Sequence, residues 1–561
     1  MTPSETLPMD APMLPPLVLR PPLGPRVLRA LVMGLAVLFH VASAGWSLIA
    51  NGREGDLAAA ARLLLREGTW LPLGTQSPAG PVVVWLVKGS MNLFGTNEFG
   101  ARFPVALAVL AAVWFTLRIG EHFGGPWRGF AASMLFLCNP GMFTLGRTLT
   151  PAPFETALLT AAFYFILRGY ERRQGRRPWY FMAWLAFSAL FFTGGPFALV
   201  LPAGVFALLA LFYRVAPLRL RPFFSWEGAA VAVATLCAAA ATGFWTLPAA
   251  LPGPGAAGMA GWQFWMLFPW SVLLLPGIYA LATRLFLRPA RPLEWDEAVP
   301  LVWWMAGLAM IVLTPARSLF STMWTWPAFA LWAAFRLEVM PRRWLLRMLM
   351  TIFVLGVITL GITSHARQIL AAVFPTIADF INAIPGFFWP AITSVAFIAV
   401  MAFTLFVASA FWLELQNHRR FAVVALFGAM IPAGYAFADA AAKFAPYFSY
   451  ADLARSIDTG PDVRREVLID GSRFSASSLL FYLDPSFRTV AVPEGAAGET
   501  AREPLPGQPQ RRYLVTRQQR LAHWKQACAA PLEIACQSGG ALLLVEKKDG
   551  DTRKKVEKLI E

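Results

Sequence analysis

Residues 391–413 read AITSVAFIAVMAFTLFVASAFWL and contain no charged side chain. A helix of about 20 apolar residues can cross the ~30 Å hydrocarbon core of a bilayer, so this stretch predicts a transmembrane helix. Comparable apolar stretches recur between Ala30 and Ala440. The sequence therefore predicts a multi-pass membrane protein, with membrane lipid as its surroundings.

The composition supports this prediction. Of 561 residues, 57% are hydrophobic and 14% are charged, and the mean hydropathy is +0.54. Soluble domains contain about 25% charged residues. The net charge of +16 does not indicate nucleic acid as a partner, because the arginines gather in short loops between apolar stretches, as the positive-inside rule describes.

These basic loops are separated from one another by pairs of apolar spans, which predicts that they all lie on the cytoplasmic side. About thirteen spans fit the pattern, and residues 1–27 form a cytoplasmic tail before a retained first helix. The expected spans start near residues 28, 101, 128, 154, 179, 196, 228, 266, 298, 318, 347, 391 and 421.

The first outer loop, residues 51–100, contains two stretches that are too short to span, Gly55–Arg66 and Pro81–Phe94. Both suit helices that lie in the membrane interface. The loop either rests on the membrane or roofs an active site, and its length favours the roof.

Residues 441–561 differ in composition, because charged residues become common there and strand-like segments alternate with helical ones. This alternation predicts a small soluble α/β domain on the outer side. The predicted strands are 466–470, 488–492, 512–516 and 540–545, the predicted helices are 474–482 and 516–529, and residues 492–510 are predicted to form a mobile loop.

Four cysteines are present. Cys138 and Cys237 lie in apolar spans and are interpreted as packing residues. Cys528 and Cys536 lie in the outer domain as either a disulfide or two buried thiols. No His, Cys or Asp cluster has the spacing of a metal site, so neither a metal nor a cofactor is predicted.

Ionisable residues at the outer ends of the spans are candidates for function, because a charged group close to lipid is costly unless it has a role. The candidates are Arg53, Glu54, Asp56, Glu98, Arg102, Arg147, Glu155 and Arg317.

Several motifs follow one another in a fixed order: Arg53-Glu54-Gly55-Asp56, Gly68-Thr69-Trp70-Leu71-Pro72, Gly80-Pro81, the segment 93–104 (LFGTNEFGARFP), Gly195-Pro196 and the segment 478–483 (SLLFYL). Together they resemble GT-C membrane glycosyltransferases of the lipid A aminoarabinose transferase and protein O-mannosyltransferase superfamily, the glycosyltransferase family 39-like group. The resemblance covers nearly the whole chain. It implies a GT-C type helical bundle, residues 28–440, in a bacterial inner membrane with the C-terminal domain in the periplasm.

The chain departs from this family where the family carries charge. The leading catalytic Asp aligns with Arg53, and a second acid aligns with Ala152. Lysines of the family align with Ala79 and Gly194, and a basic residue expected near Phe320-Ser321 is replaced by Met323 and Trp324.

The resemblance implies transfer of a sugar from a polyprenyl-phosphate donor to a lipid, glycan or protein acceptor at the outer face. A carboxylate activates the acceptor, and cations hold the leaving phosphate. The predicted catalytic acids are Glu54, with Asp56 beside it, and Glu155, and the predicted phosphate-binding residues are Arg53, Arg102 and Arg147.

Structural alternatives stand beside each assignment. Glu54, Asp56 and Glu155 also suit the first turn of a helix, Glu98 and Arg102 have the i, i+4 spacing of a structural pair, and Arg147 also suits a snorkelling side chain. The alternative function is that of a catalytically inactive member that binds a lipid-linked glycan or a partner enzyme. A transporter is disfavoured because internal repeats are missing.

Overall fold

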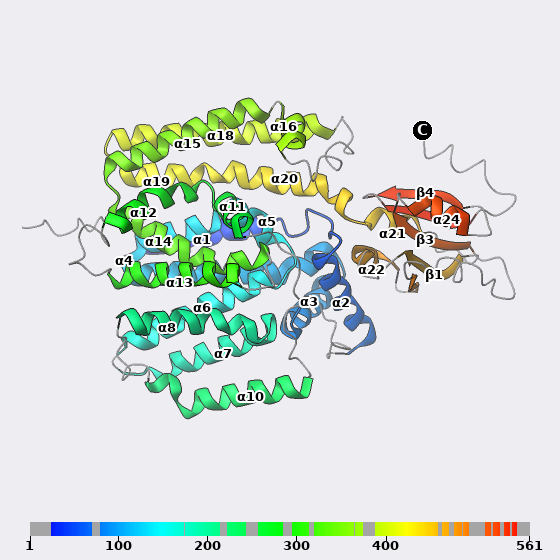
Figure 1. Ribbon diagram of the computed structural model, residues 1–561, viewed down its shortest axis with the longest axis horizontal. Helices are drawn as coiled ribbons and strands as arrows, with labels where there is room; N and C mark the ends of the chain where they lie inside the picture. Colours follow the sequence, from blue (N-terminus) through cyan, green and yellow to red (C-terminus); the bar gives the residue numbers. More distant parts are fainter. Residues whose placement is uncertain are drawn as a thin grey trace, which may run out of the picture.

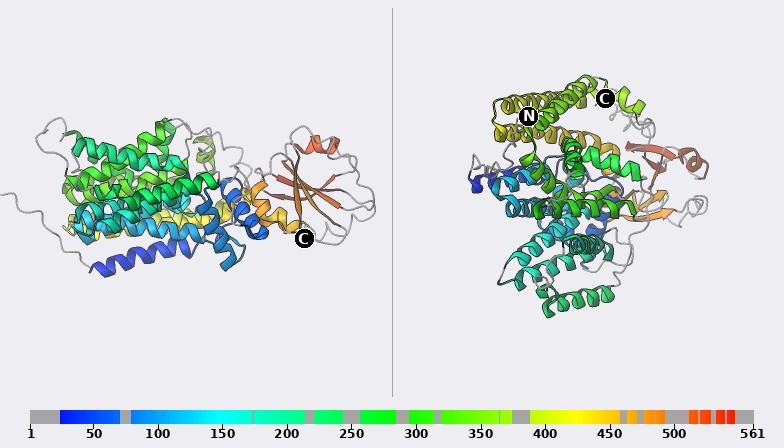
Figure 2. Two further views of the ribbon diagram at one scale, coloured as in Figure 1. Left: turned by 90° about the horizontal axis from the view of Figure 1, so that it is seen from below. Right: turned by 60° about the vertical axis from the view of Figure 1, so that its left-hand side comes forward.

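The computed structural model describes most of the chain (Figures 1 and 2). The described residues are 24–69, 79–172, 174–213, 221–242, 256–283, 294–313, 319–363, 365–373, 388–457, 463–470, 476–484, 486–492, 511–517, 520–527, 532–538 and 541–546. Helices lie side by side in a long bundle, and a sheet lies beyond one end of it.

The first half of the bundle contains helices of very different lengths. Its elements are α1 (Pro25–Ala36), the π-helical η1 (Val37–Val41), α2 (Arg53–Glu67), α3 (Pro81–Phe94), α4 (Glu98–Leu137), α5 (Pro140–Thr144), η2 (Leu145–Arg147), α6 (Ala152–Glu171), α7 (Arg177–Gly194), η3 (Pro196–Leu199), α8 (Val200–Tyr213), η4 (Arg221–Phe224) and α10 (Trp226–Thr242).

The second half continues in the same way. Its elements are α11 (Ala256–Met266), η5 (Trp270–Leu273), α12 (Leu274–Ala282), α13 (Trp295–Leu313), η7 (Leu319–Thr325), α14 (Trp326–Val339), α15 (Arg342–Thr363), α16 (Ala366–Val373), α18 (Phe388–Leu415), α19 (Arg419–Gly428), α20 (Met430–Phe448) and α21 (Ala451–Ser456).

Within the described residues, five helical stretches are long and apolar enough to cross a membrane: 98–137, 295–312, 342–363, 389–415 and 419–448. The chain is thus a multi-pass membrane protein by this measure and by the fold described below. The expected total of about thirteen spans stays a prediction. Helix α20 runs on to Phe448, past the boundary predicted after residue 440.

Two glycine turns shape the bundle. Helix α4 contains two expected spans, because Gly124 and Gly125 leave helical geometry and Gly125 has a φ of +80°. Gly120 and Gly129 then meet face to face, where a Cβ on Gly120 would lie 2.8 Å from the Gly129 Cα. A second glycine turn lies between α7 and η3, where Gly195 has a φ of +75°.

The described ends of the basic loops, at the end of α6 and the starts of α7, α15 and α19, lie at one end of the bundle, and α2, α3 and the sheet lie at the other (Figure 1). Arg128 joins Asp296 and Glu338 by ion pairs at the basic end, and Arg342 donates to the Leu415 carbonyl oxygen at 2.7 Å. For the loops that the structure describes, the placement at the end opposite α2 and α3 agrees with the expectation; the placement of the others stays a prediction. Which end faces the cytoplasm stays a prediction.

The sheet has five strands in the order β2-β1-β3-β5-β4. The strands are β1 (Val463–Asp470), β2 (Arg488–Val492), β3 (Arg511–Arg517), β4 (Leu532–Ser538) and β5 (Ala541–Glu546). Strand β1 pairs in parallel with β2 and β3, whereas β5 is antiparallel to β3 and β4. Separate apolar clusters cover its two faces, one with α22 (Ser477–Tyr482) and one with α24 (Leu521–Ala527).

Three predictions for this domain need correction. Strand β4 was not expected, and the helix predicted from residue 516 begins only at Leu521, because β3 continues to Arg517. Cys536 is a free, partly exposed cysteine on β4, so neither a disulfide nor a buried thiol describes it. Cys528 and residues 493–510 lie outside the described part of the chain.

The sheet domain touches the bundle through α22, which packs on α2. The Ser477 hydroxyl accepts a hydrogen bond from the Gly52 amide at 3.1 Å, and the Ser478 hydroxyl donates to Asn51 Oδ1 at 2.5 Å. Gly55 fits tightly here, because a Cβ would lie 2.6 Å from Ser477 Oγ. The start of α2 is thus clamped between the bundle and the outer domain.

Candidate functional site

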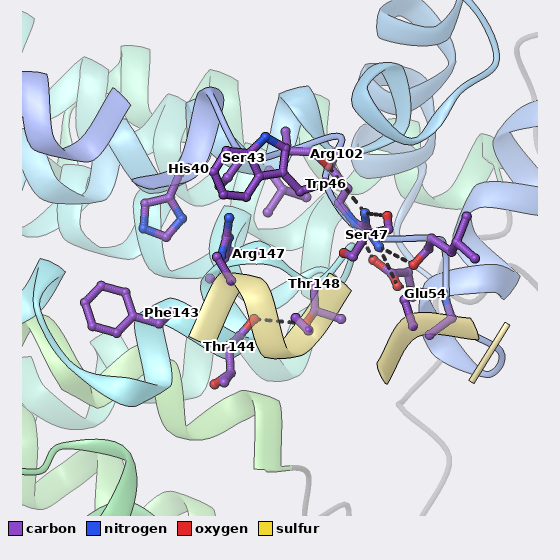
Figure 3. A pocket seen from close by; sticks show the side chains of 18 of the residues that line it. His40, Ser43, Trp46, Ser47, Glu54, Arg102, Phe143, Thr144, Arg147 and Thr148 are labelled. Atoms are coloured by element: carbon purple, nitrogen blue, oxygen red, sulfur yellow. Dashed lines mark hydrogen bonds and ion pairs between the residues drawn. The ribbon is translucent and has the colours of Figure 1, made fainter. Parts of the chain in front are cut away.

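A pocket of about 280 Å³ lies at the end of the bundle that carries α2. Its walls come from η1 and the loop that follows it, from the start of α4, from η2 and from α20 (Figure 3). The polar side chains that line it are His40, Ser43, Ser47, Glu54, Arg102, Thr144, Arg147 and Thr148. Arg102 and Arg147, which were predicted to bind phosphate, and Glu54, a predicted catalytic acid, therefore line the same cavity.

Glu54 and Arg102 form a buried, bidentate ion pair at one end of this pocket. Arg102 Nε donates to Glu54 Oε1 at 2.8 Å and Nη2 donates to Oε2 at 3.1 Å. Each residue is 5% exposed. Two backbone amides, those of Ala50 and Leu149, also donate to the carboxylate at 2.9 and 3.1 Å.

The same arginine also holds the chain that follows the first helix. Its remaining N–H groups donate to the carbonyl oxygens of Ala44, Ser47 and Leu48. A guanidinium has five N–H donors, and all five are used here. This geometry opposes the predicted role of Arg102 as a phosphate ligand, and it favours a structural role for Glu54 over that of a free base.

The predicted structural pair between Glu98 and Arg102 is not present. Glu98 instead accepts a hydrogen bond from the Tyr482 hydroxyl of α22 at 2.9 Å. Tyr482 in turn accepts from the Ile49 amide at 2.8 Å. Glu98 therefore ties the outer domain to the bundle.

Arg147 has a different environment. Figure 3 shows its side chain reaching into the pocket, with His40 and Phe143 on one side and the Arg102–Glu54 pair on the other. Among the described residues it has no hydrogen-bond or ion-pair partner. Burial lowers the pKa of Arg147 to about 10, and the nearby charge of Arg102 acts in the same direction. The guanidinium stays protonated at neutral pH, so the pocket contains a cation whose donors are available.

Two polar residues near the site were missed by the sequence analysis. His40 is 2% exposed and lies in the π-helical turn η1. Lys88 of α3 is also buried and donates to the Thr69 carbonyl oxygen at 2.6 Å. A rule that flags ionisable residues inside apolar spans would have found His40, but only the residues at the span ends were considered.

Glu155 lies in a second cluster, outside the residues that line the pocket. It is 7% exposed in the first turn of α6, and its Oε2 accepts from the indole N–H of Trp324 at 2.7 Å. Gly194 lies against Oε1, since a Cβ there would collide with that oxygen. Gly194 and Trp324, two of the residues that stand where a basic residue was expected, thus both contact this carboxylate.

The start of α2 lies between these two clusters. Arg53 is exposed, and its charge acts on both Asp56 and Glu155. Burial raises the pKa of Asp56, while a hydrogen bond from Ser477 and the charge of Arg53 act against that rise. Asp56 Oδ1 has no hydrogen-bond partner in the part of the chain that the structure describes. Arg317 lies outside the described residues.

Within the described ranges, His, Cys, Asp and Glu side chains form no group of three that could hold a metal ion. The described residues of the site offer carboxylates, cations and hydrogen-bond donors.

Comparison with known proteins adds independent findings. A family model described as dolichyl-phosphate-mannose-protein mannosyltransferase matches residues 77–241. An uncharacterized protein of Aquifex aeolicus (strain VF5) is 26% identical over 182 residues, which are 31% of this chain. The match spans only 36% of the length of that relative.

Two solved structures share the fold of nearly the whole chain. Crystal structures of ArnT from Cupriavidus metallidurans, bound to undecaprenyl phosphate and in the apo state, superpose with TM-scores of 0.76 and 0.73. They cover 94% and 92% of this chain, and 99% and 97% of their own chains, at 16% and 17% identity. At such identities the likeness concerns the fold. The chain therefore has the overall fold of ArnT, and within residues 77–241 it also matches the mannosyltransferase family model.

Proposed function

We propose that this protein transfers a sugar from a polyprenyl-phosphate donor to a lipid, glycan or protein acceptor. The observation that carries the proposal is Arg147, a cation that has no hydrogen-bond or ion-pair partner among the described residues and reaches into the pocket at the α2 end of the bundle. A guanidinium with available N–H donors is suited to bind a phosphate. The ArnT structure bound to undecaprenyl phosphate shows that this fold accommodates such a lipid.

The remaining lining suits the lipid part of the donor. Apolar side chains of α20 and the ring of Trp46 make much of the wall, and Trp46 itself is 52% exposed. An isoprenoid chain buries apolar surface favourably, at about 25 cal/mol per Å². The pocket thus combines an anion site with an apolar wall, as a lipid phosphate requires.

The proposed reaction is a single displacement. A hydroxyl or amine of the acceptor attacks the anomeric carbon, and the bond from that carbon to the phosphate oxygen breaks. The electron pair of that bond stays on the phosphate, whose charge Arg147 stabilises, and the proton of the acceptor passes to a carboxylate. General-base assistance of this kind is worth about 10²–10⁴-fold in rate.

We propose Glu155 as this carboxylate. Glu54, the first choice from sequence, is neutralised by Arg102 and accepts two amide hydrogen bonds. Glu155 accepts a hydrogen bond from the uncharged indole of Trp324. It also feels the positive charge of Arg53, an exposed residue of α2. Asp56 and Arg53 would then shape the charge around the acceptor, and Glu54 and Arg102 would hold the pocket in shape.

A specific observation also favours the alternative, a catalytically inactive member that binds a lipid-linked glycan or a partner enzyme. Arg53 replaces the leading acid of the family, and Ala79, Ala152 and Gly194 carry no charge where the family does. A pocket that keeps one available cation can bind a lipid phosphate without catalysing transfer.

The proposed location is the inner membrane of a bacterium, with the basic end in the cytoplasm and the sheet domain in the periplasm. The arginine-rich loops between the apolar spans support this orientation. An alkaline phosphatase fusion after Glu561 should be active, whereas a cytoplasm-only reporter that is active there would reverse the orientation.

Turnover and binding measured in parallel separate the two functions. The whole chain in lipid nanodiscs is incubated with a set of radiolabelled polyprenyl-phosphate sugars and an envelope-lipid extract. Release of sugar from the carrier supports the enzyme, and Glu155→Gln should reduce it by about 10²–10⁴-fold. Arg147→Ala should abolish donor binding. Exposed neighbours on α2 give the matched controls Glu67→Gln and Arg66→Ala. Donor binding without release in the wild type supports the inactive member, and no binding of any donor refutes both.

A further inference from the structure

His40 stands out as a polar side chain without a partner. It is 2% exposed and packs against the Gly146 backbone, and neither ring nitrogen has a hydrogen-bond partner of good geometry among the described residues. A buried polar group that lacks a partner costs free energy. Because His40 lines the pocket, a ligand in that pocket can supply the missing partner.

The local backbone turns this ring toward Arg147. His40 lies in η1, where the chain leaves α-helical for π-helical geometry, and such single turns often occur at functional sites. The ring fits against Gly146, where a Cβ would lie 3.1 Å from its Cε1 atom. Figure 3 shows the ring and the Arg147 side chain on the same side of the pocket.

The pocket itself offers no acid to these two residues. Glu54 is the one acidic side chain among those that line it, and its carboxylate is occupied by Arg102 and two backbone amides. An anion from outside the protein would therefore satisfy both His40 and Arg147.

An apolar stripe on α20 indicates where the apolar part of a ligand would lie. Five residues of α20 and its end line the pocket at the spacing of one helix face, and all are alanine or phenylalanine: Ala438, Ala441, Phe444, Ala445 and Phe448. A ligand whose head contacts His40 and Arg147 would place an apolar chain along this stripe.

We propose that His40 is a second ligand of the lipid phosphate and donates a ring N–H to the phosphate that Arg147 binds. This inference rests on the proposed function for the identity of the lipid, but it concerns binding and requires no turnover. The ligand class is a phosphate ester with a long apolar chain.

Binding of decyl phosphate to the whole chain in phosphatidylcholine nanodiscs tests the proposal. His40→Ala should weaken binding by about tenfold or more, the effect of losing a hydrogen bond to a charged group. Of His40→Asn and His40→Gln, whose amides can replace Nδ1 or Nε2, at least one should bind within a few fold of the wild type. His523→Ala, an exposed histidine of α24, is the control and should bind normally.

A structural role for His40 would give a different result. Removing an unpartnered polar group should leave the unfolding temperature of the ligand-free protein unchanged or higher, whereas a packing role predicts a lower temperature in all three variants. Wild-type affinity in His40→Ala overturns the inference. If Arg147→Ala alone loses binding, the phosphate site of the proposed function stands and the role of His40 falls. If both lose binding but no donor is turned over, the inference stands and transfer is refuted.

Two further binding measurements identify the source of the phosphate. Inorganic phosphate that binds as tightly as decyl phosphate would overturn the lipid part of the proposal, and decanol should not bind. Phosphatidylglycerol in the nanodisc should not displace decyl phosphate, and displacement would assign the pocket to bulk anionic lipid instead.

Discussion

The carboxylate of Glu155 lies directly against the Cα of Gly194, so that a Cβ on residue 194 would collide with Oε1. Trp324 holds the other oxygen, Oε2, at 2.7 Å through its indole N–H. The rotamer of Glu155 is therefore fixed from two sides. The missing side chain at residue 194 is what leaves room for the carboxylate, and the two residues must be considered together.

Gly194→Ala should destabilise the protein and displace Glu155. Forcing a methyl group into a filled site costs about 1–3 kcal/mol. The unfolding temperature of the purified chain should therefore be lower in this variant. In the Glu155→Ala background the same change should cost much less, because the colliding oxygen is absent. An equal cost in both backgrounds would mean that the glycine is required for another reason.

Glu54→Ala should destabilise the protein strongly, independently of any effect on transfer. It leaves the buried guanidinium of Arg102 without its counter-charge, and such a break costs about 3–5 kcal/mol. Urea unfolding monitored by circular dichroism gives the measurement, with exposed Glu67→Ala as the control. A Glu54→Ala protein of unchanged stability but without transfer activity would restore Glu54 as the base.

The multi-pass helical character of the chain could be predicted because the bilayer imposes a length on apolar helices that is visible in a sequence. The interfacial helices α2 and α3 correspond to two apolar segments too short to span. Strand β4 was missed for the opposite reason. Residues 532–538 (LEIACQS) form an edge strand that pairs with β5 alone, and edge strands carry a weaker pattern than buried ones.

The residues of the site were largely identified, but their partners were not. The rule that ionisable residues near span ends are functional candidates found Glu54, Arg102, Arg147 and Glu155. It could not show that Arg102 contacts a residue 48 positions away rather than its helical neighbour Glu98. His40 was missed because the rule was applied only to residues at the ends of the spans, whereas His40 lies inside the first apolar span.

Arg147→Met should raise the stability of the ligand-free protein while it abolishes binding of a lipid phosphate. The change removes a partly buried cation without a partner and keeps the aliphatic stem, and a gain of about 0.5–2 kcal/mol is typical of such relief. Differential scanning fluorimetry provides the readout, and exposed Arg66→Met should change neither property. A large loss of stability would show that Arg147 is structural.

Asp56→Asn should stabilise the protein at neutral pH but not in acid. Because burial raises the pKa of Asp56, the folded state binds this proton more tightly than the unfolded state. The contribution of Asp56 to the free energy of unfolding is therefore largest at low pH. It falls as the pH rises above about 3.9, the ordinary pKa of an Asp carboxyl. The unfolding temperature of the variant should exceed that of the wild type near neutral pH, and the difference should shrink toward about pH 4. A gain that is the same at both pH values would exclude this ionisation as its cause.

Tyr482→Phe should loosen the outer domain from the bundle without unfolding either part. The hydroxyl accepts from the Ile49 amide and donates to Glu98, so its loss leaves two polar groups unsatisfied at a cost of about 1–3 kcal/mol. Hydrogen exchange should become faster at Ile49 and across α2 and α22, while the centre of α4 stays protected. Tyr435→Phe, an exposed tyrosine of α20, is the matched control. Because α22 also clamps the start of α2, the same variant should weaken binding of a lipid phosphate in the pocket. Unchanged hydrogen exchange at Ile49 would show that other contacts hold the outer domain to the bundle.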